Sequence, residues 1–121
     1  MKKYLVASLL SIAASTGAFA ATVCDASGSG ATPTASEVPI GNFVVTAFTP
    51  KCSNNVNMDG QDNNTFFTVG AGSKKGKTAF MGSSAGGGIV PATTVTCSTT
   101  AGCSLSDAQS AADYATANLS S

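Results

Sequence analysis

The chain has 121 residues, as many basic as acidic side chains, and no histidine or tryptophan. All six basic residues are lysines, so the chain lacks the arginines and the excess positive charge with which proteins usually recognise nucleic acids. Without histidine it also lacks the usual general base of a serine or cysteine triad.

Residues 1–20 have the three parts of a cleavable secretory signal peptide. Lys2 and Lys3 form a positive start, and the stretch Tyr4–Ala14 is apolar apart from two serines. Ala18 and Ala20 then supply small side chains at the two positions that signal peptidase reads. We therefore predict cleavage after Ala20 and export to the periplasm or the extracellular space; the short lysine start is typical of bacteria.

Two alternatives to cleavage fit the same segment less well. A membrane-spanning helix needs about 20 consecutive apolar residues, and Ser11, Ser15 and Gly17 interrupt this one. A lipid anchor on Cys24 would need a small residue before the cysteine, where this chain has the branched Val23. We expect no membrane span after cleavage.

The four cysteines, Cys24, Cys52, Cys97 and Cys103, predict two disulfides, because they form an even set in an exported chain. Four cysteines allow three pairings. The short stretch between Cys97 and Cys103 closes easily, which favours that pair and leaves Cys24 with Cys52. The spacings match no zinc knuckle and no histidine is present, so we predict no metal site at the cysteines.

The mature chain begins with a segment that shows no apolar periodicity and then becomes rich in strand-forming residues. Residues 21–40, dominated by small and polar side chains over Ala26–Glu37, predict an N-terminal arm. Asn42–Thr49 is the clearest predicted strand, and its apolar residues on both faces predict a central position in a sheet. Pro50 ends it.

The middle of the chain alternates between predicted strands and polar or glycine-rich turns. A weak strand over Asn54–Met58 leads into a turn that runs through Asn64. The further predicted strands are Thr65–Val69, Lys77–Ser83 and Ile89–Thr96, separated by loops over residues 70–76 and 84–88. Pro91 predicts that the last of these strands lies at a sheet edge.

A short helix is predicted after Cys103. Ser104 or Ser106 can cap it, and Asp107 then lies in the first turn, near the positive end of the helix dipole. Small and apolar residues follow at helical spacing, namely Ala108, Ala111, Ala112, Ala115 and Leu119. Residues 41–121 therefore predict a mainly β domain, a small antiparallel sheet or sandwich with a short C-terminal helix, stapled by disulfides.

Two motifs suggest ligand chemistry. The stretch Ala71–Thr78 matches a relaxed phosphate-binding loop, but Thr78 and the residues after it are a poor helix start, so we interpret it as a lysine-bearing turn. The stretch Asn55–Gly60 resembles the opening of a calcium loop, yet Phe66 stands where the bidentate glutamate belongs. A solvated turn of asparagines and aspartates is the better interpretation of the second motif.

The sequence predicts a protein without catalytic residues and without a cofactor. Its cysteines are expected to be bonded, and its acids are expected in loops or on the helix surface rather than on a strand facing a pocket. We expect a secreted, non-enzymatic structural or interaction protein of the bacterial envelope, which binds protein partners or self-associates. A small extracytoplasmic module that binds a ligand or calcium is the alternative.

The export prediction can be tested on the secreted product. Mass spectrometry and N-terminal sequencing should find Ala21 as the first residue and no thiol that reacts with an alkylating reagent before reduction. An intact Met1, or four reactive thiols, would contradict the prediction.

Overall fold

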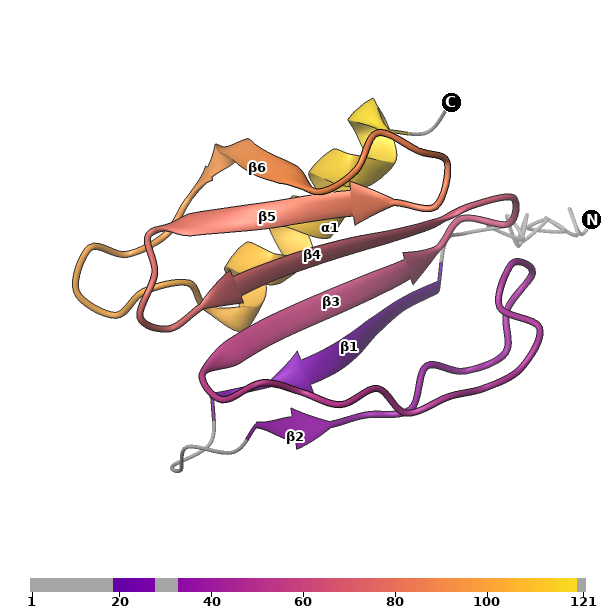
Figure 1. Cartoon of the computed structure of the whole chain (residues 1–121), viewed down its shortest axis with the longest axis horizontal. Helices are drawn as coiled ribbons and strands as arrows, with labels where there is room; N and C mark the ends of the chain where they lie inside the picture. Colours follow the sequence, from indigo (N-terminus) through magenta and orange to yellow (C-terminus); the bar gives the residue numbers. More distant parts are fainter. Residues whose placement is uncertain (1–18, 28–32, 120–121) are drawn as a thin grey trace, which may run out of the picture.

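Within residues 19–27 and 33–119, which the computed structural model describes, six strands form one antiparallel sheet in the order β2-β1-β3-β4-β5-β6 (Figure 1). In chain order the elements are β1 (Phe19–Asp25), β2 (Thr34–Ala35), β3 (Val56–Asp62), β4 (Phe67–Ser73), β5 (Thr78–Ser83), β6 (Val90–Thr96) and α1 (Leu105–Asn118). The helix lies behind the sheet in Figure 1 and covers one of its faces. The predicted mainly β fold with a C-terminal helix is confirmed, and it consists of a single sheet.

The segment expected as an N-terminal arm contributes two of the strands. β1 lies between β2 and β3, and Phe19 and Ala20 at its start are paired with Asp62 and Gln61 of β3. The predicted cleavage site after Ala20 therefore falls inside β1, and the next residue, Ala21, is paired with Gly60. The rest of the predicted signal peptide, residues 1–18, lies outside the described residues.

The strand predicted over Asn42–Thr49 is wrong. This segment forms a wide loop that is closed by a single bridge between Val38 and Phe48. The backbone amides of Phe43 and Val44 donate to the carboxylate of Asp62, at distances between 2.8 and 3.0 Å, instead of to a neighbouring strand. Because a buried side chain satisfies these amides, the segment can cover the sheet without joining it.

The predicted turn from Asp59 to Asn64 and the predicted loop over residues 70–76 are also wrong in their extent. β3 continues to Asp62, and β4 continues to Ser73, so the turns are tighter than expected. The strand predicted over Lys77–Ser83 matches β5, and the turn that follows it is confirmed. Polar residues in β3 and glycines in β4 concealed these strands, since both residue types usually favour turns.

The helix begins as predicted. Ser104 is the N-cap, and it forms a capping box with Asp107, in which each residue's side chain accepts from the other's backbone N–H. The buried residues of α1 are all alanines, namely Ala108, Ala111, Ala112 and Ala115.

The alanine face of α1 lies directly on the backbone of β4. A Cβ atom added to Gly70 would overlap the carbonyl oxygen of Ala108 and the amide nitrogen of Ala112, and one added to Gly72 would overlap Cys103. Helix and sheet therefore meet with almost no side chain between them at this point. Around the contact, a small core forms from Ala79, Met81 and Ala92 of the neighbouring strands.

A second, smaller core lies on the opposite face of the sheet. Segment 38–52, which we call the covering segment, inserts Val38 and Val44 against Val23 of β1, with Met58 and Phe67 packed beside them. The disulfide between Cys24 and Cys52 fastens the end of the covering segment to β1. Each face of the sheet thus has its own core, and the covering segment, rather than a strand, closes the second one.

Both edges of the sheet are short or irregular. β2 has two residues, and β6 carries Pro91 and a shift of register against β5. The predicted edge position of the strand that contains Pro91 is therefore confirmed. Short edges, prolines and bulges are the features that protect a sheet from adding strands of another chain.

The close contact between α1 and β4 predicts that Gly70 tolerates no side chain. Gly70→Ala should lower the free energy of unfolding by about 1–3 kcal/mol, because α1 must move away from the sheet to admit the methyl group. Gly76→Ala is the matched control, since its added Cβ would lie 3.5 Å from Ser73 Cβ in ordinary contact. Chemical denaturation measures both variants, and equal stability of the two would contradict the prediction.

Candidate functional site

Both predicted disulfides are present in the structure. Cys24 is bonded to Cys52 and Cys97 to Cys103, with Cα–Cα distances of 5.7 Å and 4.6 Å, and none of the four thiols is free. Each disulfide lies beside one of the two cores. Two disulfides indicate a non-reducing, extracytoplasmic environment.

The two motifs from the sequence lie in places that do not assemble the sites they resemble. The stretch Ala71–Thr78 spans the end of β4, a tight turn and the start of β5, with no helix after it. The stretch Asn55–Gly60 runs into β3, so its side chains alternate between the two faces of the sheet instead of converging. Among the described residues, no three His, Cys, Asp or Glu side chains gather as a metal ion would require.

A layer of polar side chains is buried between β3 and α1, which sequence reasoning missed. Asn57, Asp59 and Gln61 alternate along β3 on the helix-facing side, each 6% exposed or less. The side chain of Gln61 donates to Asp113 and accepts from Thr116, the second bond at 2.9 Å. The expectation that no acid lies on a strand is therefore wrong, since Asp59 and Asp62 are both buried on β3.

Asp59 is the one member of this layer with an unpartnered buried atom. Its Oδ2 has no hydrogen-bond partner among the described residues. Burial first, and the negative charge of Asp113 second, raise the pKa of Asp59 from 3.8 to about 6. The carboxyl group is therefore half-ionised slightly below neutral pH, under the helix.

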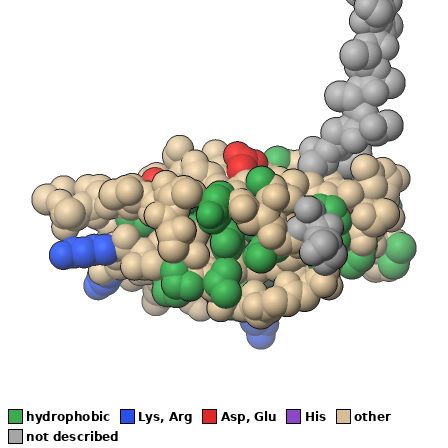
Figure 2. All heavy atoms as spheres, turned by 90° about the horizontal axis from the view of Figure 1, so that it is seen from above, with side chains coloured by type: hydrophobic (Ala, Val, Ile, Leu, Met, Phe, Trp, Pro, Cys, Tyr) green, Lys and Arg blue, Asp and Glu red, His purple; other side chains and the backbone are tan. Residues whose placement is uncertain are grey.

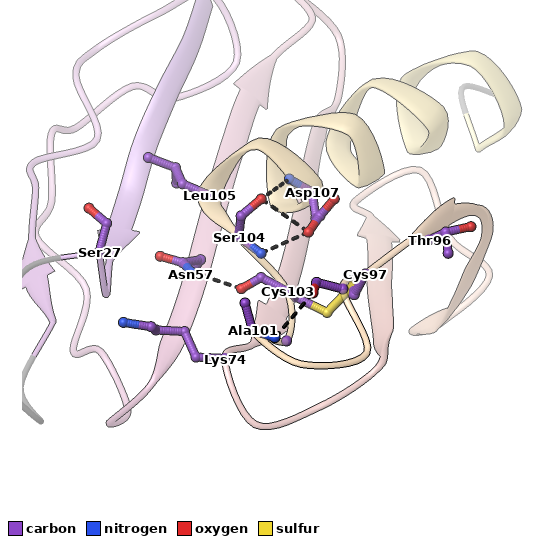
Figure 3. Close-up of a pocket in the computed structure, with 12 residues that line it drawn as sticks. Ser27, Asn57, Lys74, Thr96, Cys97, Ala101, Cys103, Ser104, Leu105 and Asp107 are labelled. Atoms are coloured by element: carbon purple, nitrogen blue, oxygen red, sulfur yellow. Dashed lines mark hydrogen bonds between the residues drawn. A yellow bond between two sulfur atoms is a disulfide. The ribbon is translucent and has the colours of Figure 1, made fainter.

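A hollow of about 610 Å³ lies at the start of α1 (Figure 3). Asn57 and Lys74 border it from the sheet side, and Ser104, Leu105 and Asp107 border it from the helix side. The disulfide between Cys97 and Cys103 forms part of its wall.

Three polar side chains at this hollow form hydrogen bonds within the fold. Asn57 accepts from the amide of Ala26 and donates to the carbonyl of Cys103, at 2.8 and 3.1 Å. Lys74 Nζ donates to the carbonyl of Ala26 at 2.9 Å, and Asp107 is held in the capping box. These bonds hold the start of α1 and residue 26 against the sheet, which is a structural role.

Ser27, at the rim of the same hollow, contacts an exposed carboxylate. Its amide donates to Asp25 at 2.8 Å and its hydroxyl donates to the same oxygen. These two bonds lower the pKa of Asp25. They complete a local turn at an exposed carboxylate.

The face of the sheet opposite α1 carries the largest exposed hydrophobic side chains. Phe80 of β5 is 44% exposed, and Ile89 is 69% exposed with its Cδ1 lying over Gly82. The covering segment exposes four more, namely Ile40, Phe43, Val45 and Phe48. We call this surface the helix-free face; it is turned towards the viewer in Figure 1.

A groove of about 440 Å³ opens beside Phe80 on this face. It is lined by Val56, Ala71 and Phe80, with Lys77 and Thr78 towards the β4–β5 turn. Its walls are mainly apolar, and Lys77 is the charged residue among those that line it. Figure 2 looks at the molecule from the β6 side, and hydrophobic side chains gather in the middle and towards the lower, helix-free side.

Comparisons with protein-family models, with curated proteins and with solved structures find no match for this chain. Within the described part of the chain, no helix is both long enough and apolar enough to cross a membrane. The candidate site therefore rests on the geometry of this chain, and the helix-free face is the surface where large apolar side chains and a groove coincide.

The buried position of Asp59 predicts a dependence of stability on pH. The native state holds the Asp59 proton more tightly than the unfolded chain, so stability should fall as the pH rises from 3.8 to about 6 and stay low above that. Asp59→Asn should raise the free energy of unfolding at neutral pH by about 1–3 kcal/mol and flatten this dependence.

Denaturation curves across the acid range measure the effect of Asp59→Asn. Glu37→Gln is the control, because it removes an exposed carboxylate directly before the covering segment. A stability profile that keeps the wild-type slope in Asp59→Asn would contradict the assignment.

Proposed function

We propose that this protein is a non-enzymatic interaction protein of the bacterial envelope, exported to the periplasm or beyond, which binds its partner through the helix-free face. The observation that carries the proposal is the placement of hydrophobic residues. The helix-side core consists mainly of alanines, with Met81 and two cysteines. In contrast, two phenylalanines of the covering segment, together with Phe80 and Ile89, are 40% exposed or more. Exposed large apolar side chains on a small domain commonly mark an interaction site.

The covering segment supports this proposal because its exposed residues are held in place. Val38 and Val44 are buried, Asp62 accepts from the amides of Phe43 and Val44, and Cys52 is bonded to Cys24. The phenylalanines between these anchors are therefore presented on a supported loop. A surface that is ordered before binding loses less entropy on association.

The sheet edges offer less for binding than the face does. A partner strand would have to pair with the two residues of β2, or with β6 at Pro91 and its register shift. Pro91 has no amide to donate, and the shift interrupts the regular spacing of donors and acceptors. We therefore place the contact on the face, and self-association through that face is one form that it can take.

The non-enzymatic part of the proposal follows from the state of the polar groups. Lys74, Asn57 and Asp107 around the larger hollow are engaged in bonds that hold the fold. Asp59 is 1% exposed beneath α1, where a substrate has no access to it. The groove beside Phe80 is lined by apolar residues with one lysine and small hydroxyls.

Photo-cross-linking compares the two faces directly. Benzoylphenylalanine at the position of Phe80 or Phe43, in protein exported by a bacterial host, should give protein or lipid adducts that mass spectrometry detects. The same residue at Gln109 or Ser110, on the exposed side of α1, should give several times less. An adduct of twice the chain mass would identify a second copy as the partner.

Similar adduct yields from both faces, or none from position 80, would contradict the proposal. Phe80 and Phe43 are suitable positions because benzoylphenylalanine keeps their aromatic ring and both side chains are already partly exposed.

A further inference from the structure

We propose that the helix-free face docks onto an anionic phospholipid surface, with the groove beside Phe80 and the nearby lysines as its first contact. The inference rests on the proposed function, since it names the partner of the same face. It is carried by the distribution of charge around the exposed apolar residues.

Lysines border the helix-free face. Lys77 lines the groove together with Phe80, Lys75 is exposed in the adjoining β4–β5 turn, and Lys51 is exposed beside Cys52 in the covering segment. In Figure 2, where the helix-free face is at the bottom, lysine side chains lie at the left and along the bottom. Positive charges around an apolar surface are what an anionic bilayer attracts.

The acids lie mainly elsewhere. Asp107 and Asp113 belong to α1, and acidic side chains occupy the top of Figure 2, on the helix side. Asp62 points towards the covering segment, but it is 4% exposed and accepts from the amides of Phe43 and Val44. Glu37, directly before Val38, is the exposed acid of this region, against the three exposed lysines.

The apolar side chains are placed to enter the boundary between headgroups and acyl chains. Phe80 has small residues, Ala71 and Pro91, as its register partners, and its side chain is 44% exposed. Ile89 lies on the same face over Gly82. Shallow insertion of such side chains, together with lysines that reach the phosphates, is the usual combination for peripheral binding.

A second copy of the chain fits this face less well. In a two-fold symmetric dimer both copies would bring the same lysine-bearing groove to the interface, which places like charges together. If the face instead packed on α1 of the next copy, its phenylalanines would meet the exposed polar residues Ser106, Gln109 and Ser110. An anionic lipid surface can pair with the lysines and also accept the exposed apolar side chains of this face.

Vesicle co-sedimentation with the exported, disulfide-bonded protein tests the inference. Vesicles of equimolar phosphatidylglycerol and phosphatidylcholine should bind the protein at low ionic strength, and vesicles of phosphatidylcholine alone should bind it at least about tenfold more weakly. Added salt should weaken the binding to anionic vesicles, because it screens the lysines.

Two variants separate the charge from the apolar contribution. Lys77→Gln should reduce partitioning about fivefold, as expected for the loss of one lysine near an anionic surface. Gln109→Glu changes the net charge by the same amount on the exposed side of α1 and should have little effect. Phe80→Ser should reduce partitioning about tenfold, and Ile89→Ser replaces it if that variant fails to fold.

Three results would overturn the lipid inference. The first is equal binding to anionic and neutral vesicles, or binding to neither. The second is an equal loss of vesicle binding in Lys77→Gln and Gln109→Glu. The third is a wild-type protein that does not bind vesicles but forms a dimer in analytical ultracentrifugation, which Phe80→Ser abolishes. In that third case the adducts from position 80 would persist, so the proposed function would stand while the lipid partner would not.

Discussion

The direct contact between α1 and β4 is the constraint on which the rest of the structure depends. A helix whose buried residues are all alanines meets a strand with glycines at positions 70 and 72, so backbone lies almost against backbone. Close packing of this kind gains dispersion energy over many atoms but leaves no volume for large side chains. Larger hydrophobic side chains, such as Met81 and Tyr114, therefore pack around this contact, and others lie in the second core or on the surface.

The contact of α1 with the neighbouring strand β3 contains a buried polar layer. Asn57, Asp59 and Gln61 of β3 lie on the side of the sheet that faces α1. Gln61 bonds to Asp113 and Thr116 of the helix, so hydrogen bonds fill part of the interface. A satisfied polar network gives one defined position for the helix. Asp59 is where the network is incomplete, because its Oδ2 is buried without a partner among the described residues.

The features that sequence reasoning found are those with local causes. The helix cap at Ser104, the β5 strand, the edge position of Pro91 and the pairing of the short cysteine loop each depend on a few neighbouring residues. The failures have non-local causes. Gln61 of β3 bonds to Asp113 and Thr116 of α1, more than 50 positions later in the chain. The strand-like residues around Phe43 form a loop because the carboxylate of Asp62, 19 positions later, accepts their amide hydrogen bonds. The sequence pattern does not show that these distant residues meet. For the same reason it did not predict the exposed phenylalanines or the groove beside Phe80.

The two disulfides fasten segments that have little regular backbone pairing of their own. The disulfide Cys97–Cys103 closes the loop between β6 and α1. The disulfide Cys24–Cys52 ties the covering segment to β1, and this segment has a single backbone bridge of its own. Closing such loops lowers the entropy of the unfolded chain, so apolar side chains are less needed to hold these segments. The covering segment can then expose Phe43, Val45 and Phe48 and still remain in place. In this chain, covalent cross-links and small-residue packing together hold the fold while several large hydrophobic residues remain exposed.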